Sequence, residues 1–373
     1  MRWLNDYTMK LVLIGFVAVI LFNDGSVQAD FTFGEPTNLC STVKSSRDDH
    51  GMTISADGLS LFFASSRSDA ENVGDWDIWV CTRETTEDEW APAENLGPIV
   101  NSSHGEGYPS ISSDGLELFF CSLYWESQRP SGYGGADIWV TRRASVFDPW
   151  EIPENLGAVV NSASHDSEPS ISADGLSLYF ASIRPGGEGG MDLYVTTRPT
   201  KNDIWSAPVN LGPVVNSSYL DMNPCISSDG LALFFRSRRD GGYGDSDIYL
   251  TRRATTSDPW GEPINLGPII NNSASQVSFY ISLDGSTLYF DTSWPSTGSY
   301  DLWQAPIMSI VDLNSDGIVD AADMCIIVDY WGTDYSLCDI GPMPWGDGIV
   351  DDQDLIILSK HLFEEFTPTK PVE

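Results

Sequence analysis

Alternating apolar and polar positions recur in five similar units along the chain. Each unit opens with Ile-Ser and an Asp-Gly pair. A run follows in which Leu occupies alternate positions and which ends in two aromatic or apolar residues. The units start at Ile54, Ile111, Ile171, Ile226 and Ile281. Such alternation is typical of half-buried strands, and an Asp-Gly pair between two strand-like runs predicts a tight hairpin. A further Asp-apolar-aromatic run follows in every unit, at Asp77, Asp137, Asp192, Asp247 and Asp301. Each unit is therefore predicted to hold consecutive antiparallel strands.

The spacing of the units is typical of a radial repeat. The aspartates of the Asp-Gly pairs are separated by 57, 60, 55 and 55 residues. Four units end in Trp-x-x-Pro-x-x-Asn-Leu-Gly or a close variant, at Trp90, Trp150, Trp205 and Trp260, which supplies a fourth strand. Four antiparallel strands per unit, repeated around an axis, describe a β-propeller. Helical periodicity is nearly absent before residue 320, so we predict an all-β fold for residues 30–307, with five blades; six blades is the alternative.

The two ends of the repeat region are predicted to share one blade. The fifth unit lacks the Trp-x-x-Pro strand after Trp303, whereas the segment Phe33–Cys40 (FGEPTNLC) matches Gly261–Pro268 (GEPINLGP). An N-terminal strand that completes the last blade would close the ring and hide its edge strands.

The repeat core I-S-x-D-G-x-x-L-x-F resembles the WD40-like (PD40) repeats of the periplasmic TolB-type propellers, over roughly residues 31–307. It departs from that family because Ser, Ala or Leu stands where those repeats have Pro before Asp-Gly, and because it has fewer units. The resemblance implies the fold alone, since propellers host binding proteins and enzymes alike.

Residues 1–29 predict a cleavable signal peptide. Arg2 and Lys10 precede an apolar run from Leu11 to Phe22, and Val27-Gln28-Ala29 is typical of a small-residue cleavage site. The run is shorter than the ~20 residues that a membrane helix needs; a membrane anchor is the alternative. No later stretch is apolar enough to span a bilayer, so we expect the mature chain, from Asp30, to be extracellular or periplasmic.

Charge and cysteine content narrow the possible partners. The formal net charge of -35 argues against a nucleic-acid partner, which needs a basic surface, and favours cations as partners.

Six cysteines are too few for a disulfide scaffold in a chain of this length. Cys81 and Cys121 lie in strand-like runs and are interpreted as core fillers. Only Cys325 and Cys338 are close enough in sequence to suggest a local pair.

A ring of oxygen-bearing residues is predicted at one mouth of the propeller channel. Five residues before each Ile-Ser pair stand Asp49, Glu106, Asp166, Asp221 and Gln276, and three histidines fall in the same stretches, His50, His104 and His165. Such a ring suits a cation or a hydroxyl-rich ligand. The alternative is a repeated structural position that bonds nearby backbone. The aspartates of the Asp-Gly pairs and of the Asp-apolar-aromatic runs recur in every unit and are interpreted as turn and strand-end hydrogen bonders.

The acidic C-terminal segment predicts calcium loops. Residues 308–373 hold 14 acids and 2 bases. Positions 1, 3, 5, 9 and 12 of an EF-hand loop are matched by Asp312, Asn314, Asp316, Asp320 and Asp323, with Gly317 at position 6 and the carbonyl of Ile318 at position 7. A second, partial loop places Asp347, Ile349, Asp351 and Asp354 at positions 5, 7, 9 and 12. Its positions 1 and 3 would be Met343 and Trp345, which bind no hard ion; Asp339 is the alternative first ligand if residues 341–344 bulge out. We therefore expect the module to bind Ca²⁺. Only the first loop has the complete EF-hand ligand spacing.

Two loop-plus-helix units without an entering helix resemble a type I dockerin, over about Val311 to Phe363, and we expect this module to occupy residues 308–367, followed by a short tail, 368–373. The resemblance implies a cohesin-like or cell-surface protein partner and a link to polysaccharide-degrading complexes. The residues that help to select the cohesin in that family are here Ala321-Ala322 and Asp352-Gln353 rather than a Ser-Thr-like pair. The identity of the partner therefore stays open.

These patterns favour a secreted, calcium-binding protein whose propeller binds a carbohydrate or protein ligand and whose C-terminal module docks to a partner. The alternative is a carbohydrate-active enzyme, a glycoside hydrolase or polysaccharide lyase at the channel mouth; a structural surface component is a third possibility. An enzyme needs paired acids that break the repeat, as Glu168, Asp48 and Glu126 do. Because the ring itself is nearly symmetric, no residue is assigned as catalytic.

Overall fold

The computed structural model describes residues 31–39, 43, 45–67, 73–123, 129, 131–268, 270–271, 276–292, 300–314, 318–333, 335 and 337–364, without the side chains of 276 and 277. The predicted signal peptide lies outside these ranges. Within them, no helix combines the length and the apolar character that crossing a membrane requires.

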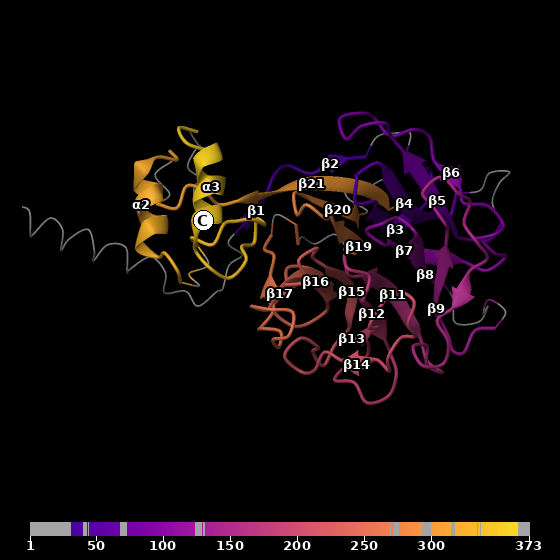
Figure 1. Ribbon diagram of the computed structural model, residues 1–373. Coiled ribbons are helices and arrows are strands. Elements are labelled where there is room, and N and C mark those ends of the chain that lie inside the picture. Colours follow the sequence, from indigo (N-terminus) through magenta and orange to yellow (C-terminus); the bar gives the residue numbers. More distant parts are fainter. Residues whose placement is uncertain are drawn as a thin grey trace, which may run out of the picture.

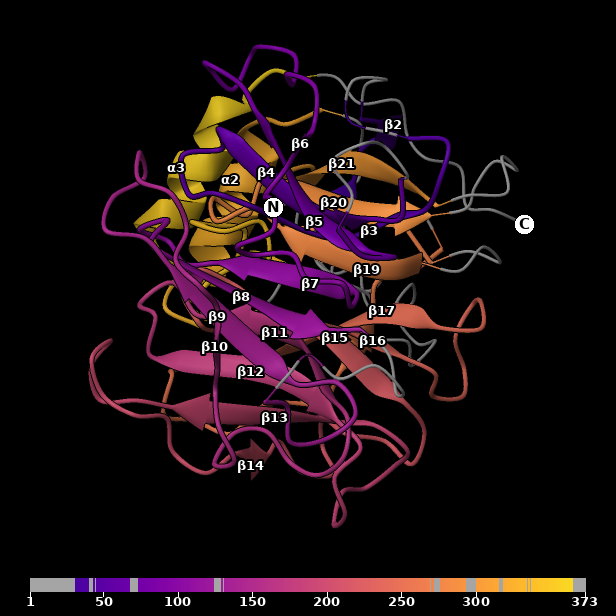
Figure 2. The ribbon, with the colours of Figure 1, turned by 90° about the vertical axis from the view of Figure 1, so that its right-hand side faces the viewer.

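Five antiparallel sheets stand around a common axis, as predicted (Figures 1 and 2). Blade 1 holds β3 (Asp49–Ile54), β4 (Ser60–Ser65), β5 (Asp77–Thr82) and β6 (Glu94–Asn95). Blade 2 holds β7 (Glu106–Ile111), β8 (Glu117–Ser122), β9 (Ile138–Arg142) and β10 (Glu154–Asn155). Blade 3 holds β11 (Asp166–Ile171), β12 (Ser177–Ser182), β13 (Asp192–Thr197) and β14 (Val209–Asn210). Blade 4 holds β15 (Asp221–Ile226), β16 (Ala232–Ser237), β17 (Asp247–Arg252) and β18 (Ile264–Asn265).

The fifth blade is closed by the N-terminal segment, which confirms the predicted sharing of the two chain ends. It holds β19 (Gln276–Ile281), β20 (Thr287–Thr292) and β21 (Asp301–Ser309). The short strand β2 (Thr37–Asn38) pairs with the first part of β21, and β1 (Phe31–Phe33) pairs with its far end, Phe31 opposite Ser309. The pairing of β1 extends the blade beyond the predicted strand.

The repeated aspartates serve the local backbone, as predicted. Oδ1 of Asp57 accepts hydrogen bonds from the Leu59 N–H at 3.0 Å and from the Ser55 hydroxyl at 2.5 Å, while Gly58 takes the left-handed backbone (φ +72°) that the hairpin requires. At the start of the third strand, Asp77 accepts from two backbone N–H groups of the preceding turn and from the Asn95 amide. The same bonds recur in other blades, so these residues shape the fold.

The C-terminal module consists of two loop-plus-helix units. The helices are α2 (Ala321–Asp329) and α3 (Asp352–Lys360), and each is capped by the loop's ninth residue: Asp320 accepts from the Ala322 N–H at 2.7 Å and Asp351 from the Gln353 N–H at 2.8 Å. A small core of its own includes Val319, Ile327, Val350 and Leu358, all fully buried.

This module also packs on the propeller through Trp345. The indole is 2% exposed, and its ring centroid lies 5.2 Å from that of Phe234 in blade 4 and 6.2 Å from that of Phe31 in β1. Met343 packs against the same core. Residues of the second loop that cannot bind calcium are therefore the ones that join the module to blades 4 and 5.

The described cysteines form no disulfide with one another. Cys81 and Cys121 are fully buried in strands, which confirms their interpretation as core fillers, and Cys225 is buried in the same way. Burial raises the pKa of the Cys121 thiol to about 12. Cys325 is exposed and Cys338 is buried, and both are free, so the suggested local pair does not form a disulfide in this structure.

Candidate functional site

The four carboxylates of the predicted ring lie inside their own blades. Asp166 is fully buried and accepts hydrogen bonds from the Ser162 N–H at 2.6 Å, the Ser182 hydroxyl at 2.6 Å and Nη2 of Arg184 at 2.5 Å. Asp49 and Asp221 have matching partners, with arginine nitrogens at 3.0 and 2.9 Å. These oxygens brace the loop before the inner strand and do not face the channel, which is the structural alternative raised by the sequence.

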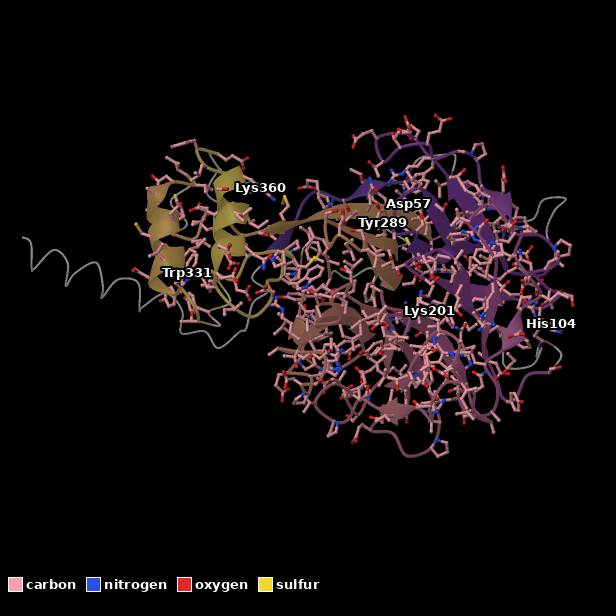
Figure 3. The ribbon with its side chains drawn as sticks, in the orientation of Figure 1. Asp57, His104, Lys201, Tyr289, Trp331 and Lys360 are labelled. Carbon is pink, nitrogen blue, oxygen red and sulfur yellow. The ribbon has the colours of Figure 1, made fainter. Side chains whose placement is uncertain are left out.

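The remaining members of the predicted set are placed differently from one another. Glu106 is also fully buried and is bonded by Ser102 and Arg129; burial raises the pKa of its carboxyl to about 8. The side chain of Gln276, at the start of β19, lies outside the described part. His104 contacts Ser103 at the outer side of the ring (Figure 3). Among the described members of the set, His50 and His165 line the pocket that is described below.

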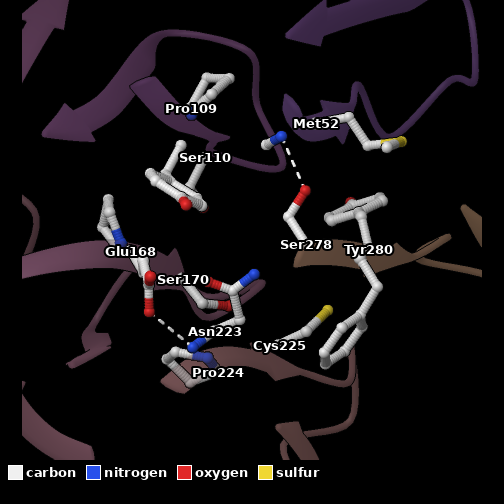
Figure 4. Close-up of a pocket in the computed structure, with 14 residues that line it drawn as sticks. Met52, Pro109, Ser110, Glu168, Ser170, Asn223, Pro224, Cys225, Ser278 and Tyr280 are labelled. Carbon is white, nitrogen blue, oxygen red and sulfur yellow. Dashed lines mark hydrogen bonds between the residues drawn. The ribbon is translucent and has the colours of Figure 1, made fainter. Parts of the chain in front are cut away.

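The channel is lined instead by the residues two positions after the ring residues. The register of every inner strand shifts here, between His50 and Met52 in blade 1 and at matching places in the other four. The residues at these five bulges are Gly51, Tyr108, Glu168, Asn223 and Ser278. Tyr108, Glu168 and Asn223 have φ values of 51°, 59° and 48°, a left-handed backbone that costs free energy in residues other than glycine. A bulge re-aims a side chain, and all five bulge residues line the channel, among them Glu168, Asn223 and Ser278 (Figure 4).

A second layer of charge lies behind the bulges, on the second strands. At one repeat position three blades carry Ala64, Cys121 and Ala181, whereas blades 4 and 5 carry Arg236 and Asp291. Arg236 is 8% exposed and Asp291 is fully buried. Two buried charges at a position that is otherwise small and uncharged break the repeat.

Asp291 forms an ion pair with His50. Its Oδ2 lies 3.1 Å from Nδ1 of His50, and its Oδ1 accepts from the Ser278 N–H at 2.9 Å. Burial lowers the pKa of His50, but the hydrogen bond to Asp291 and the charges of Asp291 and Asp48 outweigh it, so that the pKa is raised. Burial acts to raise the pKa of Asp291, yet the bonds from His50 and Ser278 lower it overall. Both shifts favour an imidazolium beside a carboxylate.

Glu168 lies across the channel from this pair, beside Arg236. Its Oε2 accepts the Asn223 N–H at 2.7 Å (Figure 4). Burial raises the pKa of Glu168, against the lowering effect of the Arg236 charge and of the Asn223 bond. Tyr108 is affected by the charges of Glu168, Arg236 and Asp291 together, and its pKa lies well above the usual value, chiefly because of burial. Together with the His50–Asp291 pair, these groups therefore form one electrostatically connected cluster drawn from all five blades.

A pocket of about 370 Å³ opens above this cluster between blades 1, 2 and 3, and it is lined by His50, Ala64, Trp76, Gly107, Tyr108, Leu123, His165, Ser167 and Glu168. The His50 ring stacks on Trp76 with centroids 5.0 Å apart and tilts against Tyr300 at 4.8 Å. Nδ1 of His165 accepts the Ala136 N–H at 3.3 Å, and burial lowers its pKa. The hydroxyl of Ser167 is buried and has no hydrogen-bond partner among the described residues. The pocket thus combines an aromatic wall with polar groups available to a ligand.

Only part of this site was predicted from the sequence. Of the three repeat-breaking acids, Glu168 lies in the channel, Asp48 bonds the Tyr300 N–H at 3.0 Å near His50, and Glu126 lies outside the described residues. Arg236, Asp291 and Trp76 were missed. The signal was present in the aligned units, because these positions differ between blades while their neighbours repeat.

In the C-terminal module, the last aspartate of each predicted loop accepts equivalent backbone hydrogen bonds. Oδ1 of Asp323 accepts from the N–H groups of Leu313 and Asn314, and Oδ1 of Asp354 accepts from those of Ile340 and Gly341. Asp339 therefore stands where Asp312 stands in the first loop, and Pro342 to Trp345 form the extra residues. This placement matches the alternative in which Asp339, rather than Met343, begins the second loop.

The predicted calcium ligands lie in these loops, but their geometry does not define a metal site. The first loop contains four of its predicted ligands within the described residues: Asp312, Asn314, Ile318 and Asp320. Asp316 lies outside the described residues. Burial, with the charges of Asp354 and Asp347, raises the pKa of Asp339 to about 7. Across the described ranges, no three His, Cys, Asp or Glu side chains are grouped so that they could hold a metal ion. The donors are all oxygen, which suits a hard dication such as Ca²⁺, and the ion itself stays a prediction.

Comparison with known proteins finds only distant structural likeness. No family model and no curated protein matches the chain. Among solved structures it is similar to an α-L-arabinofuranosidase from Lactobacillus brevis (14% identity, covering 72% of this chain and 92% of that one, TM-score 0.49). It is also similar to the catalytic domain of a GH62 α-L-arabinofuranosidase from Coprinopsis cinerea (10%, 76% and 98%, 0.48). TolB from Acinetobacter baumannii is a further match (14%, TM-score 0.46); the alignment covers 71% of this chain and 56% of the TolB chain. Likeness at this level carries no argument about ligand or activity.

Proposed function

We propose that the protein is a secreted binding protein, whose propeller holds a small polar ligand in the pocket above the channel and whose C-terminal module, organised by calcium, docks to a cohesin-like or cell-surface partner. One observation carries the first half: the residues that break the repeat gather at a single place. Glu168 lines the channel, and Arg236 and Asp291, from two other blades, lie close enough behind it for their charges to act together with that of Glu168 on Tyr108. A structural repeat has no need of such convergence, whereas a ligand site does.

The backbone supports this reading. Three non-glycine residues in the left-handed region each cost of order 1–3 kcal/mol. Strain of this kind persists where the surrounding structure enforces it, and it clusters at binding and active sites. Because the bulges point the strained residues into the channel, the fold maintains their direction at a cost in stability.

Glu168→Gln is expected to weaken ligand binding while leaving the fold intact. The amide keeps an oxygen that can accept the Asn223 N–H, but it removes the negative charge and replaces one acceptor oxygen with an N–H donor. Loss of one charge-assisted hydrogen bond of about 1.5–3 kcal/mol corresponds to a roughly 10- to 150-fold higher Kd. The measurement is a thermal-shift screen of the full chain against oligosaccharides and peptides, followed by calorimetry of the hits with both forms. Equal affinity of both forms for every hit would contradict the assignment of the site.

The docking half rests on the two matching loops and on their all-oxygen donor sets. When bound, calcium would neutralise the crowded carboxylates and so stabilise the module. Its residues would then act in two ways: Asp320 and Asp351 cap the helices, and Asp323 and Asp354 hold the loop backbones. The helix faces would be presented to the partner protein in a fixed arrangement.

A chelator is expected to reduce the helical circular-dichroism signal of the full chain while leaving the propeller's near-ultraviolet signal unchanged. The reason is that α2 and α3 are the helices of the described structure and both follow a predicted calcium loop. Asp316→Ala should remove the response to calcium, whereas Asp329→Ala, an exposed acid outside the loops, should retain it. Magnesium should substitute poorly, because it demands a tighter octahedral shell. A helical signal indifferent to both chelator and calcium would contradict the proposal.

A carbohydrate-active enzyme is the second candidate, and one observation favours it. The environment raises the pKa of Glu168 and lowers that of Asp291. A carboxyl group whose pKa is raised can serve as the general acid on a glycosidic bond, and Glu168 lines the pocket. Release of reducing ends from oligosaccharides by the wild type and not by Glu168→Gln, at unchanged affinity, would decide for the enzyme.

A further inference from the structure

We propose that the pocket takes an uncharged sugar residue, with one face of the ring against Trp76 and its hydroxyls directed at Ser167 and Glu168. This inference rests on the proposed function that the pocket binds a ligand. It narrows the chemical class of that ligand from a carbohydrate or protein to an uncharged sugar.

The charges at the site cancel in pairs. His50 faces Asp291 at 3.1 Å, and the positive charge of Arg236 acts on Glu168. A cationic ligand would meet the imidazolium of His50 at the pocket wall and the guanidinium of Arg236 below it. An anionic ligand would meet Glu168 at the pocket floor and the Asp291 carboxylate behind His50. Neither sign of charge finds an uncompensated partner, so a neutral ligand avoids a desolvation cost that an ion would bear.

The field of the whole molecule disfavours anions further. A net charge of -35 makes approach of an acidic polysaccharide unfavourable at low ionic strength. Uronate and sulfated chains are thereby excluded more strongly than neutral ones. Cations would be attracted at long range, but the paired charges of the pocket give them no specific site.

Aromatic and hydroxyl groups are arranged on different walls of the pocket. Trp76 and Tyr300 occupy the same repeat position in blades 1 and 5, where the other blades have Ala136, Met191 and Ser246, and both contact His50. Trp76 supplies an apolar wall. Blade 3 supplies Ser167, whose buried hydroxyl has no partner within the described structure, and Glu168. An apolar face opposite hydrogen-bonding edges is the surface that a pyranose or furanose ring offers, since its hydroxyls both donate and accept.

The test is calorimetric titration of the full chain with three classes of probe: neutral xylo-, cello- and manno-oligosaccharides, oligogalacturonate, and choline. We expect binding of at least one neutral series and none of the charged probes. Trp76→Ala should weaken that binding roughly thirty-fold, the loss caused by truncating a binding hot spot. Ser167→Ala should weaken it roughly five-fold, as for one neutral hydrogen bond, and should not disturb folding because the hydroxyl has no partner in the chain. Phe147→Ala, at a side chain 95% exposed and far from the pocket, is the matched control and should bind like the wild type.

The possible failures separate the two proposals. Binding of oligogalacturonate or choline that is lost in Glu168→Gln would overturn the neutral-sugar inference and keep the binding function. Binding of neutral sugars that is unchanged in both Trp76→Ala and Ser167→Ala would overturn the inference by placing the ligand elsewhere. No binding of any probe here, together with no hit in the oligosaccharide and peptide screen, would remove both.

Discussion

Asp166→Ala is expected to destabilise the propeller by about 3–5 kcal/mol. The substitution removes a fully buried carboxylate that accepts from two backbone or hydroxyl donors of the preceding loop and from Arg184. It leaves the Arg184 guanidinium, whose side chain is 15% exposed, without its charge partner. Removing one member of a buried pair costs far more than the pair contributes, because the remaining charge stays desolvated. Urea unfolding monitored by near-ultraviolet circular dichroism measures the change.

The matched control is Asp245→Ala, an exposed acid in the neighbouring blade. Surface substitutions of this kind change stability by about 0.5 kcal/mol or less. If both variants unfold at the same urea concentration, Asp166 is not a structural brace, and the oxygen ring predicted from the sequence regains its claim to a ligand. With the expected outcome, a loss of binding in Asp166→Ala would report on folding and not on ligand contact.

Trp345→Ala is expected to separate the unfolding of the C-terminal module from that of the propeller and to cost about 3–5 kcal/mol. The indole fills a site between Phe234 and Phe31, and its removal leaves a cavity at the junction of two folded parts. Calorimetry should show one transition in the calcium-loaded wild type and two in the variant. Limited proteolysis should then cleave between β21 and α2 in the variant first.

Trp331→Ala serves as the control for the junction. Trp331 belongs to the same module but is 47% exposed at the end of α2 (Figure 3). We expect its calorimetric trace to match that of the wild type. A second transition in Trp331→Ala, or its absence in Trp345→Ala, would show that the module is held by other contacts, such as the bond from the Ser309 hydroxyl to the Ile340 carbonyl at 2.9 Å.

The fold was predictable because each repeat contains residues whose local backbone preferences define its hairpin. Asp57 and Gly58 define a hairpin by their own backbone preferences, and each copy of the pattern predicts the same hairpin again. The closing role of Phe33–Cys40 followed from a missing strand in one unit and an extra one at the other end. The blade count and the strand order are confirmed, and α2 begins at Ala321 within the first predicted loop-plus-helix unit.

The site was less predictable because side-chain direction is a tertiary property. Asp166 looks like a ligand in the sequence, yet a β-bulge two residues later reverses which side chains face the channel. The docking of Trp345 is likewise a contact between residues far apart in the chain, and no local pattern marks it. The sequence did show which positions differ in residue type between the repeats. Glu168 is one such position, and Arg236 and Asp291 are others.

The anchoring of Trp345 in the propeller has a consequence for how the pocket meets its surroundings. A flexible linker would let the propeller sample every orientation around its attachment point. Here β21 runs directly from blade 5 into the module, and the indole fixes their relative angle. A partner that binds α2 or α3 would therefore also fix the orientation of the pocket. The effective concentration of the pocket would then be high for targets on the side that it faces and low for targets on other sides.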